Sequence, residues 1–181
     1  MRDSSGHIIN SIQRTTDRLL LRDITEDDVT AKYVRWMNDP RVNRYLESRF
    51  VTHTAESIRR SVVELSQNSV FAAVIDRATG DHIGNIKLGP VDHHHRTADI
   101  GIVIGEERCW GKGFATESII AMTDHAFEVL GLAKVTASVY AINLASIRAF
   151  QKAGFELEGT RCSQFSIGES RTDAVMLGRT P

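Results

Sequence analysis

Two adjoining runs decide the fold of this chain: A-D-I-G-I-V-I-G at residues 98–105 and R-C-W-G-K-G at residues 108–113. The first reads as an apolar strand and the second as a glycine-rich turn, after which an apolar helix pattern starts at Phe114. Such a turn presents the unpaired N–H groups and the positive dipole end of a helix N-terminus, which bind phosphate. Glycine lets the backbone approach an anion closely, and Lys112 adds positive charge. The stretch therefore predicts a site for a ligand that carries a pyrophosphate.

The spacing of this turn argues against two common nucleotide-binding loops. The P-loop requires G-x-x-x-x-G-K-[ST], but Gly105 lies one residue too far from Gly111, and Gly113 follows Lys112 where a hydroxyl should hold magnesium. The dinucleotide fingerprint G-x-G-x-x-G needs a third glycine where this chain has Thr116. A phosphotransferase of the P-loop class is therefore disfavoured.

Length and composition limit the number of domains and the kinds of partner that the chain can have. The 181 residues, of which 41% are hydrophobic, suffice for one domain with a full core. The 22 basic and 23 acidic side chains give a formal charge of −1, so there is no basic field to hold nucleic acid. No apolar run approaches the ~20 residues that span a bilayer, and no secretory signal is visible. Cys109 and Cys162 form no C-x-x-C pair and suit reduced thiols. We expect a cytoplasmic protein that binds neither nucleic acid nor membrane.

The whole chain alternates strand and helix patterns. We expect residues 1–16 to be a lead-in and residues 17–181 to form the domain. One helix, at residues 54–67, should bury Ile58, Val62 and Leu65 on one face. The expected strands cover residues 18–24, 70–76, 82–88, 98–104, 134–140, 155–160, 161–167 and 173–178, and the expected helices cover residues 25–37, 41–46, 54–67, 114–130 and 143–153. This order predicts an α/β sheet with helices on both faces.

A second motif, N-x-x-S followed by K-x-G-F, lies at residues 143–155. Helix capping alone explains it, because Asn143 is a good N-cap and Gly154 a good C-terminal stop. However, this motif follows R-x-x-G-x-G-x-A at residues 108–115, and the pair resembles the two halves of the acetyl-CoA site of GCN5-related N-acetyltransferases (GNAT). The resemblance covers residues 18–178, and the branch it is most similar to comprises the ribosomal-protein N-terminal and amino-sugar acetyltransferases.

The resemblance implies a single-domain GNAT-like fold. Its sheet is mixed and mostly antiparallel, and its central strands splay apart so that the pantetheine of acetyl-CoA lies in the gap. No metal is implied. The implied acetyl-CoA-binding residues are Ile102, Val103, Ile104, Arg108, Trp110, Gly111, Lys112, Gly113, Ala115, Thr116, Asn143, Ser146, Phe150 and Lys152.

Acetyl transfer to an amine needs a polarised thioester carbonyl and a base. A backbone N–H within residues 102–104 can donate to the carbonyl where the splayed strand leaves groups unpaired. An alkylammonium has a pKa of about 10.4, so a carboxylate must take its proton. Asp99 is the first candidate base and Glu106 the second, although an ordinary outward-facing strand residue explains Asp99 equally well.

The leaving thiolate also needs a proton. Many GNAT enzymes supply it from a tyrosine four residues after the serine position, but this chain has Phe150 there. Ser146 is the local alternative, Tyr140 is a weaker one, and a thiolate can leave without a dedicated acid. Neither cysteine lies near a histidine in a nucleophile pattern, so we expect direct attack in a ternary complex.

The acceptor should be selected by residues 33–54, which lid the substrate cleft in the family. Aromatic rings beside guanidinium groups suit a base and a diphosphate, which favours a nucleotide-linked amino sugar. Packing in the core is the competing explanation of Trp36. A protein N-terminus is the next acceptor, followed by a polyamine, for which Glu26, Asp27, Asp28 and Asp39 would supply acid. The candidate substrate-binding residues are Trp36, Tyr45, Arg49 and Asp99.

A metal site, a homodimer and an inactive relative are the remaining alternatives. His93, His94 and His95 lack carboxylate or cysteine partners at ligand spacing, so a solvated loop is expected rather than a metal site. A homodimer is left open. The chain could also be a sensor or an inactive relative that binds acetyl-CoA without turnover, which the absence of a tyrosine at residue 150 favours and the intact glycine motif opposes.

Overall fold

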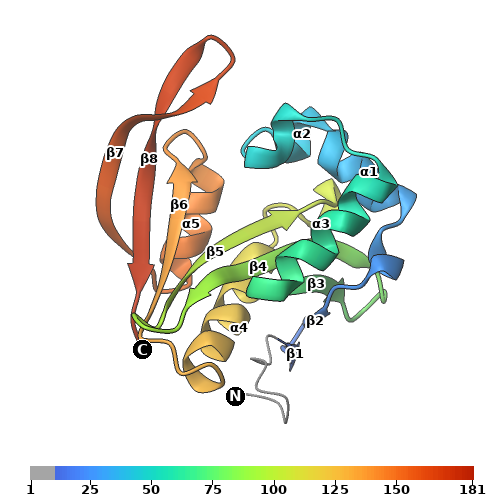
Figure 1. Cartoon of the computed structure of the whole chain (residues 1–181), viewed down its shortest axis with the longest axis horizontal. Coiled ribbons are helices and arrows are strands. Elements are labelled where there is room, and N and C mark those ends of the chain that lie inside the picture. Colours follow the sequence, from blue (N-terminus) through green and yellow to red (C-terminus); the bar gives the residue numbers. More distant parts are fainter. Residues whose placement is uncertain (1–10) are drawn as a thin grey trace.

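The computed structural model describes residues 11–181, in which one eight-stranded sheet forms the central layer (Figure 1). The strands follow the order β1-β2-β3-β4-β5-β6-β8-β7. All neighbouring strands are antiparallel except β5 and β6, which are parallel. Their bounds are β1 (Gln13–Thr15), β2 (Leu19–Asp23), β3 (Val70–Asp76), β4 (His82–Asp92), β5 (Thr97–Ile104), β6 (Lys134–Tyr140), β7 (Glu156–Ile167) and β8 (Ser170–Arg179). The predicted mixed, mostly antiparallel α/β sheet is confirmed.

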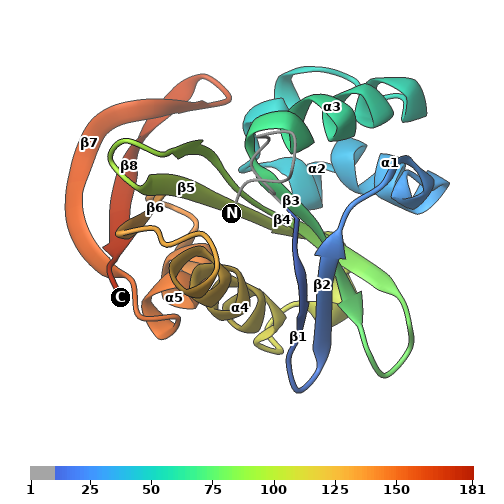
Figure 2. The same ribbon diagram turned by 60° about the horizontal axis from the view of Figure 1, so that its bottom comes forward.

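Helices cover both faces of the sheet, as predicted (Figure 2). One face carries α1 (Ala31–Asn38), α2 (Pro40–Asn43) and α3 (Ala55–Asn68), and the other carries α4 (Phe114–Glu128) and α5 (Leu144–Lys152). Short 3-10 turns lie at Glu26–Asp28, Glu47–Phe50 and Glu107–Cys109.

The two helical layers have separate cores. Beneath α4, the apolar side chains of Ile119, Met122 and Ala126 are fully buried, as their spacing predicts. Beneath α3, Ile58 and Val62 are buried, but the prediction for Leu65 is wrong, because 36% of it is exposed.

The predicted helix at residues 25–37 is broken by an ion pair. The Asp28 carboxylate accepts hydrogen bonds from Nη2 and Nη1 of Arg22, at 2.6 and 2.8 Å, and from the backbone N–H of Thr25 at 2.8 Å. This cluster fixes Glu26–Asp28 as a 3-10 turn, and α1 starts later, capped by the side chain of Thr30. Pairing with Arg22 of β2, six residues earlier in the chain, therefore overrides the helix signal.

Three predicted strand bounds are also corrected. Residues 155–160 and 161–167 are not two strands but the single strand β7, whose register shifts between Leu157 and Gly159 and again between Arg161 and Phe165. Strand β4 extends to Asp92 across a register shift after Leu88. Strand β1 lies inside the expected lead-in, because Gln13–Thr15 pairs with β2. Residues 1–10 of that lead-in lie outside the described residues.

The sheet splits in its middle. Strands β5 and β6 pair through only Thr97 with Lys134, Ala98 with Val135, and Asp99 with Thr136. Beyond Asp99, β5 stays paired with β4 as far as Ile104, whereas β6 stays paired with β8 as far as Tyr140. The predicted splay is thus present, and it opens a gap between the strands.

Candidate active site

A cavity of about 610 Å³ occupies the gap between β5 and β6. The start of α4 and one face of α5 along its length form its walls, and α2 lies on its rim. Most of the predicted acetyl-CoA-binding residues line it, namely Ile102, Val103, Ile104, Trp110, Gly111, Gly113, Ala115, Thr116, Asn143, Ser146, Phe150 and Lys152. The two sequence motifs therefore meet at one cavity.

The glycine-rich turn opens the N-terminus of α4 toward this cavity. Gly111 and Gly113 have φ values of +71° and +83°, in the left-handed region that favours glycine. No side chain caps the helix, so the N–H groups of Phe114, Ala115 and Thr116 have no partner within it. All three residues line the cavity. An uncapped N-terminus of this kind fits the diphosphate of CoA.

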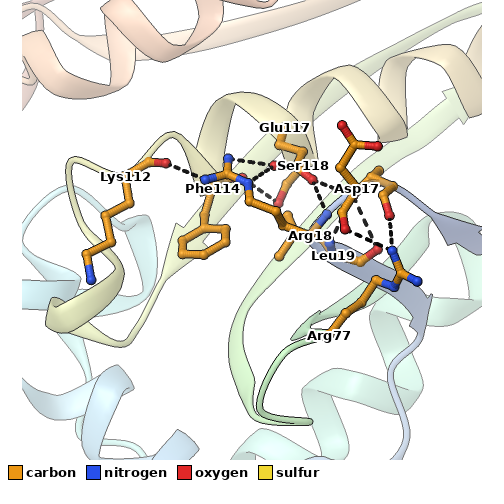
Figure 3. Close-up of polar contacts among 9 residues, drawn as sticks. Asp17, Arg18, Leu19, Arg77, Lys112, Phe114, Glu117 and Ser118 are labelled. Atoms are coloured by element: carbon orange, nitrogen blue, oxygen red, sulfur yellow. Dashed lines mark hydrogen bonds and ion pairs between the residues drawn. The ribbon is translucent and has the colours of Figure 1, made fainter.

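Two predicted cofactor residues do not line the cavity. Arg108 is exposed and pairs with Asp81 at 2.6 Å and with Glu106 at 3.3 Å. Lys112 is exposed as well. Its backbone carbonyl accepts a hydrogen bond from Arg18 (Figure 3). Its ammonium group extends away from that contact.

The edge of β5 supplies backbone donors to the gap. The N–H of Gly105 donates to Ile83 on β4 at 2.9 Å. Because successive residues of a strand direct their polar backbone groups to opposite edges, Ile102 and Ile104 direct theirs into the gap. The Ile104 carbonyl is taken by the indole N–H of Trp110 at 2.7 Å. The N–H groups of Ile102 and Ile104 are thus positioned to polarise a carbonyl oxygen.

Asp99 lies at the closed end of the gap, just outside the cavity lining, where its side chain is partly desolvated although the residue remains exposed to solvent. Its Oδ1 accepts a hydrogen bond from the Thr136 hydroxyl at 3.2 Å. Desolvation raises the pKa of the Asp99 carboxyl, and the Thr136 hydrogen bond and the positive charge of Lys87 oppose this rise. A carboxylate of raised basicity suits proton removal from an amine.

The second candidate base, Glu106, is committed to structural contacts. Its Oε1 accepts from the indole N–H of Trp36 at 3.1 Å, and its Oε2 accepts from Arg108. Trp36 is only 5% exposed and packs so closely beneath Gly105 that a Cβ there would lie 2.0 Å from the indole ring. Neither Trp36 nor Glu106 lines the cavity. The core explanation of Trp36 therefore holds.

Two candidate hydroxyl residues for the leaving thiolate, Tyr140 and Ser146, lie in the cavity wall. Phe150, which is 2% exposed and packs on Phe155, has no hydroxyl to offer. The Tyr140 hydroxyl donates to Glu47 and accepts from Arg49. The Ser146 hydroxyl, in contrast, makes no hydrogen bond within residues 11–181, although its backbone N–H donates to the capping side chain of α5.

The segment from α2 through the 3-10 turn Glu47–Phe50, here called the rim, is attached to both sides of the gap, the β5 arm and the β6 arm of the sheet. Arg49 donates to Tyr140 and to the carbonyl of Ser166, each at 2.6 Å. On the other side, Arg41 pairs with Glu107 at 2.7 Å. Arg49 thus holds the rim on β6 and β7 and does not line the cavity. Tyr45 does line it, with the Arg44 guanidinium 4.8 Å from its ring centre.

Sequence reasoning missed several lining residues. Ser138 faces the cavity from β6, and Arg148 faces it from α5. The signal for Arg148 is helical spacing, because Ala145, Arg148, Ala149 and Lys152 recur at i, i+3, i+4 and i+7 and share a face. Within the described chain, every charged residue in the lining is basic: Arg41, Arg44, Arg148 and Lys152.

The three adjacent histidines lie outside this site. His93, His94 and His95 are exposed in the turn between β4 and β5, where Asp92 accepts from the backbone N–H groups of the last two. Among residues 11–181, no group of three or more His, Cys, Asp or Glu side chains is placed to hold a metal ion. In the same range no helix is long and apolar enough to cross a membrane.

Comparisons with known proteins agree with this geometry. The family model "Acetyltransferase (GNAT) domain" matches residues 18–156. The uncharacterized N-acetyltransferase YoaA of Bacillus subtilis is 36% identical over 155 residues, which cover 80% of this chain and 82% of that protein. The spermidine N(1)-acetyltransferase of Escherichia coli K12 is 33% identical over 98 residues, which cover 54% of this chain and 52% of that protein.

Solved structures share the fold. The spermidine N-acetyltransferase of Vibrio cholerae, in complex with CoA and spermine, aligns with a TM-score of 0.81 at 23% identity, covering 91% of this chain and 96% of that one. The match of the family model extends from the start of β2 to the start of β7 and contains both motifs of the cavity. The chain therefore belongs to the GNAT family and is an N-acetyltransferase.

Proposed function

We propose that this enzyme moves the acetyl group of acetyl-CoA to the primary amine of a small molecule, by direct attack within a ternary complex. The observation that carries the proposal is that an uncapped helix N-terminus and an open strand edge face one cavity. The first suits a diphosphate and the second suits a thioester carbonyl. Ile102 and Ile104 would polarise that carbonyl through their backbone N–H groups.

The proton steps follow from the side chains nearest the gap. The amine nitrogen attacks the carbonyl carbon, the C–S bond breaks, and the amine proton passes to the Asp99 carboxylate directly or through water. The leaving thiolate takes its proton from solvent, or from the Ser146 hydroxyl as solvent returns a proton to that oxygen. Glu106 is the weaker candidate for the base, because it does not line the cavity and its two oxygens accept hydrogen bonds from Trp36 and Arg108.

The charge of the cavity supports an acceptor that carries negative charge. On the rim, the charged lining residues Arg41 and Arg44 are both basic, and the Arg44 guanidinium over Tyr45 offers a stacked pair for a base and a phosphate. We therefore keep a nucleotide-linked amino sugar as the first acceptor, now supported by Arg44 and Tyr45 rather than by Trp36 and Arg49.

A polyamine is the second candidate acceptor, because two of the relatives compared above are named spermidine acetyltransferases. None of the four acidic residues expected for it lines the cavity, and two of them are held in ion pairs. Asp28 pairs with Arg22, and Asp39 pairs with Arg41 at 2.7 Å. Glu47 and Asp99 would have to attract the polycation instead. A protein N-terminus remains the third candidate.

The deciding experiment measures thiol release from acetyl-CoA with three kinds of acceptor: a UDP- or dTDP-linked amino sugar, ribosomal-protein N-terminal peptides, and spermidine. A reaction without acceptor corrects for hydrolysis. We expect turnover with the amino sugar. Turnover with spermidine or a peptide alone would keep the reaction and replace the acceptor. Tight acetyl-CoA binding without turnover in the whole panel would instead favour a sensor.

A further inference from the structure

The turn between β1 and β2 lies against the first turn of α4 (Figure 3). From this turn Arg18 reaches the glycine-rich loop. Its Nη1 donates to the carbonyl of Lys112 at 2.9 Å, and its Nε and Nη2 contact Oε2 of Glu117 at 2.7 and 2.6 Å. Its guanidinium carbon lies 4.6 Å from the ring centre of Phe114. These three contacts bracket Gly113, where the loop enters the helix.

Glu117 holds the other end of this contact. Its Oε1 accepts from the backbone N–H of Arg18 at 2.9 Å and from the Thr16 hydroxyl at 2.6 Å. Burial alone would raise the pKa of the Glu117 carboxyl, but the bonds from Thr16 and Arg18 outweigh burial and lower it. Glu117 is therefore a carboxylate, and without Arg18 its charge would repel an anion at this helix end.

The turn that carries Arg18 is itself fixed. Arg77 donates to the carbonyls of Thr16 and Asp17 at 2.6 and 2.8 Å, and the Thr16 hydroxyl accepts from the backbone N–H of Leu19 at 3.0 Å. Arg18 thus projects from an ordered support. A planar guanidinium can serve two acceptors at once, which a lysine ammonium does less well.

The carbonyl contact sets the direction of one peptide plane. In a trans peptide the C=O and the next N–H point to opposite sides. Because the Lys112 carbonyl points at Arg18, the N–H of Gly113 points away from it. A Gly-Lys-Gly loop without this contact would sample many conformations and would lose more entropy when a ligand ordered it.

We propose that Arg18 is a positioning residue, which pre-organises the loop at residues 111–113 for the diphosphate of acetyl-CoA. This rests on the proposed use of acetyl-CoA as donor. Arg18 acts through Lys112 and Glu117, so its effect should depend on whether the donor carries a diphosphate.

The test compares acetyl-CoA with acetyl-pantetheine, which has the same thioester but no diphosphate. For Arg18→Ala we expect kcat/KM with acetyl-CoA to fall about tenfold through KM, with kcat within about twofold. With acetyl-pantetheine kcat/KM should stay unchanged. Arg18→Lys, which keeps the charge, should lie between these values, and it also tests the idea if the alanine variant does not fold. Arg60→Ala removes an exposed arginine on α3 and is the matched control.

Calorimetry separates this inference from the proposed function. CoA should bind the Arg18→Ala protein about tenfold more weakly than the unmodified protein, while pantetheine affinity should not change. An equal loss with both donors would mean that Arg18 only supports the fold, and no loss with acetyl-CoA would mean that it does not hold the loop; either result overturns the inference. If the unmodified protein binds CoA but transfers no acetyl group, the proposed function fails and the binding comparison still decides the role of Arg18.

Discussion

At the scale of single residues, Asp99 makes the sharpest prediction. Asp99→Asn should lower kcat/KM about a hundredfold, because the amide cannot take the amine proton. Desolvation raises the pKa of the carboxyl, so the unmodified enzyme should gain activity as pH rises through that pKa. The variant should lack this low-pH limb of the pH–rate profile. The pH–rate profile measures both. Asp92→Asn, at the exposed end of β4, should keep the limb; an intact limb in Asp99→Asn would remove Asp99 as the base.

The sequence predicts the placement of the motif residues better than that of the isolated candidate residues. Gly111 and Asn143 are placed by local geometry, a left-handed turn and a helix cap, and such geometry is legible in the sequence. The roles of Trp36, Arg49 and Glu106 depend on partners up to 117 residues away. Only the folded chain reveals that these polar groups are already satisfied, so the sequence could not exclude them from the site.

At the scale of elements, the turn before α4 can be tested through its glycine. Gly111 has a φ of +71° and open space around it, so Gly111→Leu should strain the backbone and place a side chain where the diphosphate approaches. We expect the KM for acetyl-CoA to rise at least about tenfold. Gly131→Leu is the matched control, because Gly131 has a φ of +65°, equally open surroundings and a place beyond the far end of α4. An unchanged KM in Gly111→Leu would contradict the loop assignment.

Elements with strong local signals were predicted well. Strands β3 and β6 have the predicted bounds at both ends, and α4 begins at Phe114 as predicted. The errors arise where tertiary contacts decide. The Arg22–Asp28 pair breaks a predicted helix, and register shifts carry β7 through a stretch that reads as two strands. A bulge leaves no periodic trace, because it interrupts the alternation from which strands are recognised.

At the scale of the whole molecule, the sheet has two arms joined by three residue pairs between β5 and β6. A ligand that contacts both arms should stabilise the folded state by linking them. At 100 times its Kd, CoA should add about 2.7 kcal/mol to the free energy of unfolding. Hydrogen exchange should show protection at residues 101–104 and 138–140 and little at β1 to β3. Protection spread evenly over the sheet would contradict this picture.

The placement of the rim in the chain has a consequence for how such enzymes diversify. The rim is one short peptide, α2 and the 3-10 turn Glu47–Phe50, whereas the donor side is assembled from residues 100–152. Arg41 and Arg49 fasten this peptide to opposite arms. Under the proposed function, substitutions between Arg41 and Arg49 would change which amine enters the cavity, while the residues that bind the acetyl donor would stay the same.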